Sequence, residues 1–124
     1  MKTFMVFGVF MMAISLVQVN VASANKSEAS IEGPTNAAKG SEVTLRITAS
    51  HSVNTASHYT EWLKVTANNK EVARWDYTKD KRPEGAVFTK EIKIKVTEDA
   101  EIVAEASCNN HGSKGSVKHK ITVK

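Results

Sequence analysis

The stretch Glu42-Val43-Thr44-Leu45-Arg46-Ile47-Thr48 alternates polar and apolar residues without a break. Its three apolar side chains share one face, which is the pattern of a β-strand with one buried side. The same two-residue period recurs along the chain, and no stretch of useful length carries a helical period. The sequence therefore predicts an all-β protein.

Seven strands are predicted from this pattern, at residues 31–34, 42–48, 59–65, 70–77, 88–96, 102–108 and 117–123. In the third of them Trp62 is expected to share a face with His58 and Thr60. Asn68 and Asn69 are predicted to form a hairpin turn, because asparagine tolerates positive φ. Short alternating strands over about 100 residues favour an immunoglobulin-like antiparallel β-sandwich of seven strands, or a closely related barrel.

The first 24 residues have the composition of a signal peptide. Lys2 precedes an apolar run over residues 4–19, and Ala22-Ser23-Ala24 is a small-x-small cleavage site. The run is short for a membrane span, and polar residues follow it. We expect cleavage after Ala24, a single domain at residues 25–124, a periplasmic or secreted location, and no membrane association after cleavage.

The charge distribution and the cysteine content limit the possible functions. Without Lys2, 16 basic and 13 acidic residues remain, and the two signs are interspersed, so no basic cluster indicates nucleic-acid binding. Cys108 is the single cysteine and cannot form an internal disulfide. It is therefore buried, paired with another chain, or bound to a metal. In an oxidising compartment a free thiol is prone to oxidation, which favours the interpretation that Cys108 binds a metal.

The loop Ser107-Cys108-Asn109-Asn110-His111-Gly112 offers a thiolate and an imidazole to one point in space. His51 and His58 lie where strands meet loops, so a sandwich can bring all four side chains to one rim. Nitrogen and sulfur ligands suit iron, copper or zinc and exclude calcium and magnesium. The plainer alternative is a buried cysteine beside solvated loop histidines. His119 is placed in the last strand, as a structural histidine outside the site.

The residues His58-Tyr59-Thr60-Glu61-Trp62, preceded by His51 and followed by Cys108-Asn109-Asn110-His111-Gly112, resemble the iron domain of the superoxide reductase family. This family is also called the desulfoferrodoxin or neelaredoxin family. The resemblance implies the immunoglobulin-like fold and a mononuclear non-haem iron with four equatorial histidines, an axial cysteine and one open position. By position, His51, His58 and His111 match equatorial ligands, and Cys108 matches the axial ligand.

The resemblance also implies an activity, in which superoxide, one electron from a redox protein and two protons give hydrogen peroxide. The family's Glu-Lys-His-x-Pro segment aligns with Asn25-Lys26-Ser27-Glu28-Ala29. Lys26 is thus retained as the catalytic residue whose charge attracts superoxide. Ser27 stands where the fourth histidine is expected, which puts the redox potential, the iron affinity and the preferred metal in question.

Two other functions fit the same residues. A cupredoxin-like electron carrier also uses Cys-x-x-His and an upstream histidine on a sandwich, but every methionine, the usual axial ligand, precedes residue 25. A non-catalytic sandwich is the other alternative, with Cys108 as a sulfur carrier or as part of a protein-binding surface. The sequence leaves open the electron donor, the oligomeric state and whether the chain is an enzyme.

Overall fold

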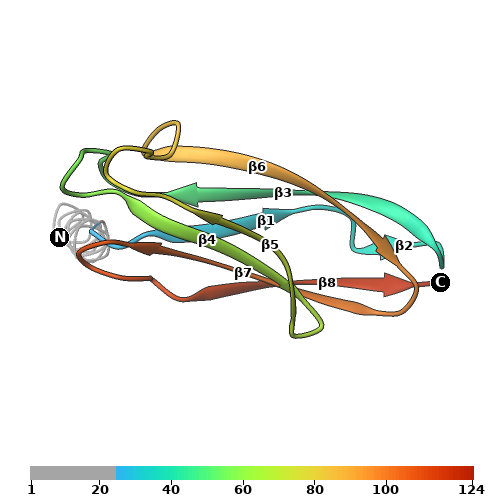
Figure 1. Ribbon diagram of the computed structural model, residues 1–124. Helices are drawn as coiled ribbons and strands as arrows, with labels where there is room; N and C mark the ends of the chain where they lie inside the picture. The colour runs from blue at the N-terminus through green and yellow to red at the C-terminus, as the bar shows by residue number, and fades with distance from the viewer. Residues whose placement is uncertain (1–24) are drawn as a thin grey trace, which may run out of the picture.

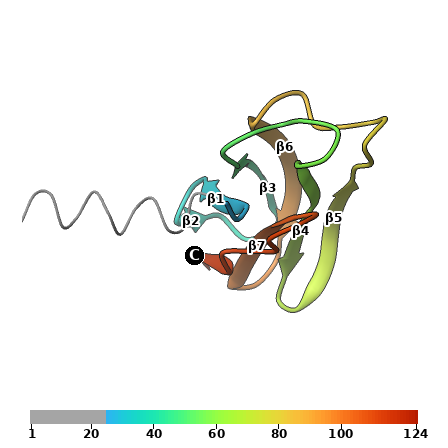
Figure 2. The same cartoon turned by 90° about the vertical axis from the view of Figure 1, so that its left-hand side faces the viewer.

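Two β-sheets packed face to face form the protein, seen in a computed structural model that describes residues 25–124. The three-stranded sheet has the order β1-β3-β6, with bounds Glu28–Glu32, Ser41–Ser50 and Val87–Val96. The five-stranded sheet has the order β2-β8-β7-β4-β5, with bounds Asn36–Ala37, Ser116–Val123, Ala100–Cys108, Thr60–Ala67 and Lys70–Asp76. Figures 1 and 2 show the two layers, which confirm the predicted all-β sandwich.

Each of the seven predicted strands overlaps one strand of the structure. Residues 25–124 contain one further strand, β2, which has two residues and pairs in parallel with β8. The pattern cannot predict it, because two residues are too few to show alternation. The other strand pairs in this part of the chain are antiparallel.

The signal peptide predicted for residues 1–24 falls outside the described residues and stays a prediction. In the part of the chain that the structure describes, no helix combines the length and the apolar character needed to cross a membrane.

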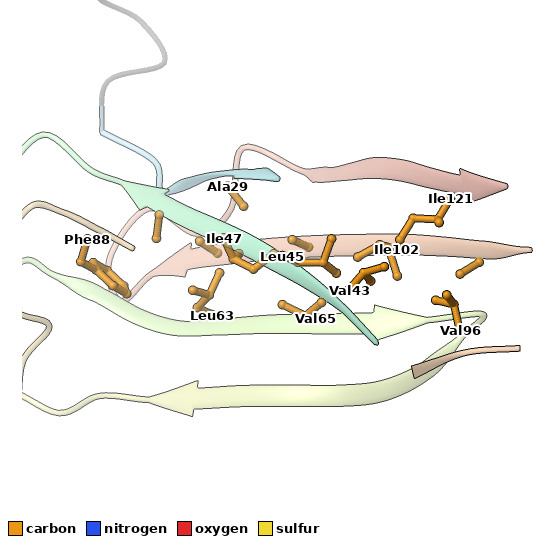
Figure 3. Packing of buried hydrophobic residues seen from close by; sticks show 14 residues of the cluster. Ala29, Val43, Leu45, Ile47, Leu63, Val65, Phe88, Val96, Ile102 and Ile121 are labelled. Carbon is orange, nitrogen blue, oxygen red and sulfur yellow. The ribbon is translucent and has the colours of Figure 1, made fainter. Parts of the chain in front are cut away.

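The core lies between the two sheets and follows from the alternation in β3. Leu45 and Ile47 of β3 are fully buried and face Leu63 of β4 and Ile102 of β7 across the sandwich (Figure 3). Burying such a side chain stabilises the fold by about 1.5–3 kcal/mol. This core fixes the ends of β3, β4 and β7 relative to one another.

The turn between β4 and β5 forms as predicted. Asn68 and Asn69 have φ angles of 49° and 68°, and the pairing of Ala67 with Lys70 closes a two-residue hairpin. Asparagine adopts this left-handed conformation more readily than most residues.

The prediction that Thr60 and Trp62 share a face is wrong. β4 pairs Thr60 with Cys108 and Trp62 with Ser107, so an extra residue is inserted between the two pairs. Such a bulge reverses the alternation at that point. Thr60 is therefore buried directly opposite Cys108, whereas Trp62 is partly exposed.

Candidate metal centre

One end of the sandwich gathers the candidate ligands. β3 and β7 both end there and β4 begins there, at the left of Figure 1, and Figure 2 faces this end. His51 directly follows β3, Cys108 is the last residue of β7, and His58 lies two residues before β4. Because β3 belongs to one sheet and β4 and β7 to the other, the cluster spans both sheets.

His58 lies at the centre of the four side chains, close to His51, Cys108 and His111. His58 Nε2 and His111 Nδ1 are 3.0 Å apart. The ligand atoms of His51, His58 and Cys108 lie within 4.8 Å of one another. The His58 ring is 4.5 Å from that of His51 and 4.8 Å from that of His111, between centroids. The structure thus brings together the four residues that the sequence singles out.

A tight turn at the end of β7 carries both Cys108 and His111. The main chains of Cys108 and Gly112 bond each other in both directions, at 2.9 and 3.1 Å, and Gly112 has a φ of 78° that favours glycine. The N–H of Asn110 donates to Cys108 Sγ at 3.4 Å. Such a bond withdraws electron density from the sulfur and tunes its strength as a ligand.

Asn109 and Asn110 hold the segment that carries His58, a role that their sequence pattern does not predict. Asn109 Oδ1 accepts from the N–H of Tyr59 at 2.9 Å. The side chains of Asn109 and Asn110 both donate to the carbonyl of Ser57, at 3.1 and 2.7 Å. The only signal was their position within the Cys-Asn-Asn-His loop, which does not reveal what an amide side chain will bond.

His51 is buried and is held by main-chain carbonyls of its own loop and of the segment before β6. Its main-chain N–H donates to Ala86 O at 2.8 Å, and its ring Nδ1 lies 2.7 Å from Val53 O. A short contact of this kind to a carbonyl places the ring proton on Nδ1. Nε2 is then the atom of His51 with a free lone pair for a ligand.

His58 is tuned toward its neutral form. Burial lowers the pKa of His58 below its ordinary value, and the nearby His51 and His111 lower it further, while a hydrogen bond to the main chain of Asn25 raises it. A neutral imidazole is the form that binds a metal.

The metal-free domain is expected to lose stability as the pH falls below about 6.5. Unfolded chains protonate His58 near that pH, whereas its lowered pKa keeps His58 neutral in the folded domain. Between about pH 6.5 and the lower pKa that His58 has in the folded domain, the unfolded state binds more protons. Stability is therefore retained above this pH range and declines as the pH falls through it. Urea unfolding at pH 7.5 and 5.5 measures the decline. His58→Gln should reduce it, and an equal decline in both proteins would contradict this assignment.

Ser27 and Lys26 lie beside the cluster. Ser27 is fully buried, and its hydroxyl bonds that of Thr60 at 2.8 Å. The main chain of Ser27 bridges the turn after β7 by donating to Gly112 O and accepting from Lys114 N. Lys26 is exposed and forms no ion pair with residues 25–124.

The donor set fits a transition metal. Two ligand atoms about 2.1 Å from one ion and at a right angle are about 3.0 Å apart. The separation of His58 Nε2 and His111 Nδ1 matches this value. Three imidazoles with one thiol suit iron, copper or zinc. His51 and Cys108 are buried and His111 is exposed, so one side of the cluster is open to solvent.

Known proteins share this architecture. A superoxide reductase (neelaredoxin) variant from Ignicoccus hospitalis has a TM-score of 0.65 at 18% identity, over 84% of this chain and 86% of that one. A proposed superoxide reductase from Thermotoga maritima has a TM-score of 0.57 at 23% identity, over 78% and 86%. The sulfur carrier protein SoxY from Chlorobium limicola has a TM-score of 0.56 at 13% identity, over 77% of both chains.

At these identities the structural likenesses show the fold alone. No curated protein matches the chain by sequence. The family model for desulfoferrodoxin, however, matches residues 17–114, which is most of the chain. This protein therefore belongs to the desulfoferrodoxin family.

Proposed function

We propose that this protein is a mononuclear non-haem iron protein that reduces superoxide to hydrogen peroxide with electrons from a redox protein. One observation carries the proposal: three imidazoles and one thiol, from the ends of β3, β4 and β7 and the turn after β7, lie together in a member of the desulfoferrodoxin family. His51, His58, His111 and Cys108 would hold the ion. When bound, ferrous iron supplies the electron that, with two protons, converts superoxide into hydrogen peroxide.

The protein's own groups prepare the site for this reaction. The turn of residues 108–112 fixes the sulfur of Cys108, and the N–H of Asn110 limits how strongly that sulfur donates. Asn109 and Asn110 keep His58 in place through Ser57 and Tyr59. A preorganised donor set lowers the cost of changing the oxidation state of a bound metal.

Access and charge favour a small anion. His111 is exposed, so solvent reaches the cluster on that side, and Lys26, which precedes the buried Ser27, has no paired carboxylate within residues 25–124. An unpaired positive charge at the mouth of a site raises the local concentration of anions. We assign Lys26 this guiding role in the proposed reaction.

The proposal includes export. Residues 1–24 carry the features of a cleaved signal peptide, so the domain would work in the periplasm or outside the cell. There it would meet superoxide that does not arise in the cytoplasm.

Elemental analysis of the exported, tag-free protein, together with its visible spectrum, tests the proposal. We expect one equivalent of iron and a thiolate charge-transfer band that disappears on reduction. The band should return when superoxide is added to the reduced protein, with one peroxide formed per superoxide consumed. Copper with an intense band at different energy would instead favour an electron carrier. A colourless, metal-free protein would favour a sulfur-carrying or protein-binding sandwich and contradict the reductase.

A further inference from the structure

Both ring nitrogens of His51 face main-chain carbonyl oxygens. Nδ1 is 2.7 Å from Val53 O, and Nε2 is 3.2 Å from Asn25 O. A neutral imidazole carries one N–H, so it can donate to only one of these oxygens. The shorter contact takes the proton, and the unprotonated Nε2 then lies beside Asn25 O with no hydrogen atom of its own to share.

Two acceptors at this distance repel each other unless one cation binds both of them. The separation is close to the distance of about 3.0 Å expected for neighbouring ligands of one ion. His58 Nε2 and His111 Nδ1 show nearly the same separation on the other side of the cluster. The distance between His51 Nε2 and Asn25 O thus matches the distance between two ligands of one cation.

The fold explains why this carbonyl is available. Ser27 is buried, and its hydroxyl is engaged by Thr60, so its side chain offers the cluster nothing in place of an imidazole. Its main chain is fixed by bonds to Gly112 and Lys114, and this anchor sets the path of the two residues before it. Asn25 therefore passes the cluster with its carbonyl oxygen toward His51.

We propose that the main-chain carbonyl oxygen of Asn25 is a metal ligand, which supplies the donor that Ser27 cannot. The inference rests on the proposed iron site and adds to it a ligand that no side chain provides. Carbonyl oxygen is a harder and weaker donor than imidazole. The centre then has three imidazoles, one thiolate and one amide oxygen.

Ferrous iron affinity of shortened chains provides the first test. Residues 25–124 hold the complete core, and residues 25 and 26 are exposed and precede β1. A chain beginning at Ser27 is expected to bind ferrous iron about tenfold more weakly than one beginning at Asn25. Asn25→Ala retains a main-chain oxygen and should bind more tightly than the shortened chain. Equal affinities for all three proteins would overturn the inference.

A spectroscopic test does not depend on the stability of the shortened chain. Asparagine labelled with ¹³C at the carbonyl is incorporated into the chain of residues 25–124, which is then loaded with ferric iron. Electron–nuclear double resonance should detect a ¹³C coupling that is missing from the labelled Asn25→Ala protein, where the carbonyl at position 25 is unlabelled. Identical couplings in the two samples would reject the carbonyl as a ligand.

The two proposals fail in different ways. If the unaltered chain of residues 25–124 binds no iron, the proposed function fails and this inference falls with it. If that chain binds iron but shows neither the affinity difference nor the coupling, only the Asn25 ligand is wrong.

Discussion

Replacing Cys108 by serine is expected to abolish the visible charge-transfer band of the iron-loaded protein. The band requires a thiolate on the metal, and serine offers a harder oxygen of similar size in its place. Cys108 is buried, and its main chain is held by Gly112, so the exchange leaves the fold intact. The visible spectrum of the oxidised Cys108→Ser protein, with iron content measured on the same sample, reports the result.

The neighbouring residue offers a matched control. Ser107 is also buried but points to the opposite face of β7, because successive side chains of a strand alternate. Ser107→Ala should therefore retain the band. A band that persists in Cys108→Ser would mean that the sulfur does not bind the metal, and the site would be wrongly placed.

Replacing His58 by alanine is expected to weaken iron binding at least about 100-fold, since it removes the central imidazole of the cluster. His58 contacts both His51 and His111, so its loss removes one ligand and the spacer between two others. Ferrous iron affinity, measured by competition with a coloured chelator, detects a change of this size.

His119 supplies the control for this second prediction, because it is the one histidine outside the cluster. It lies in β8, and its Nε2 is 2.9 Å from Pro34 O. His119→Ala should keep its iron affinity even if the domain becomes less stable. Equal losses in the two variants would point to a general effect on folding and would argue against His58 as a ligand.

Much of the fold follows from the sequence because burial on one face of a strand leaves a visible period. Leu45 and Ile47 mark β3 in this way, and Asn68 marks the hairpin turn. The grouping of His51, His58, Cys108 and His111 follows too, since each lies at or near a strand end, in the loops at one rim of the sandwich.

Other features have no such signature. The bulge after Thr60 depends on how β4 pairs with β7, which involves residues far apart in the chain. The side-chain bonds of Asn109 and Asn110 depend on which carbonyls the fold brings near them. A main-chain oxygen such as that of Asn25 is identical in every residue, so the sequence holds no information about its role.

The position of the cluster across both sheets links metal binding to the stability of one end of the sandwich. An ion held by His51 on one sheet and Cys108 on the other is a cross-link between the two layers at one end of the sandwich. Its binding free energy adds to the free energy of unfolding, because the unfolded chain does not keep these groups together. Loss of the ion would loosen this end and leave the hydrophobic core intact. Susceptibility of this end to proteases would then depend on metal loading, so that empty copies are degraded before loaded ones.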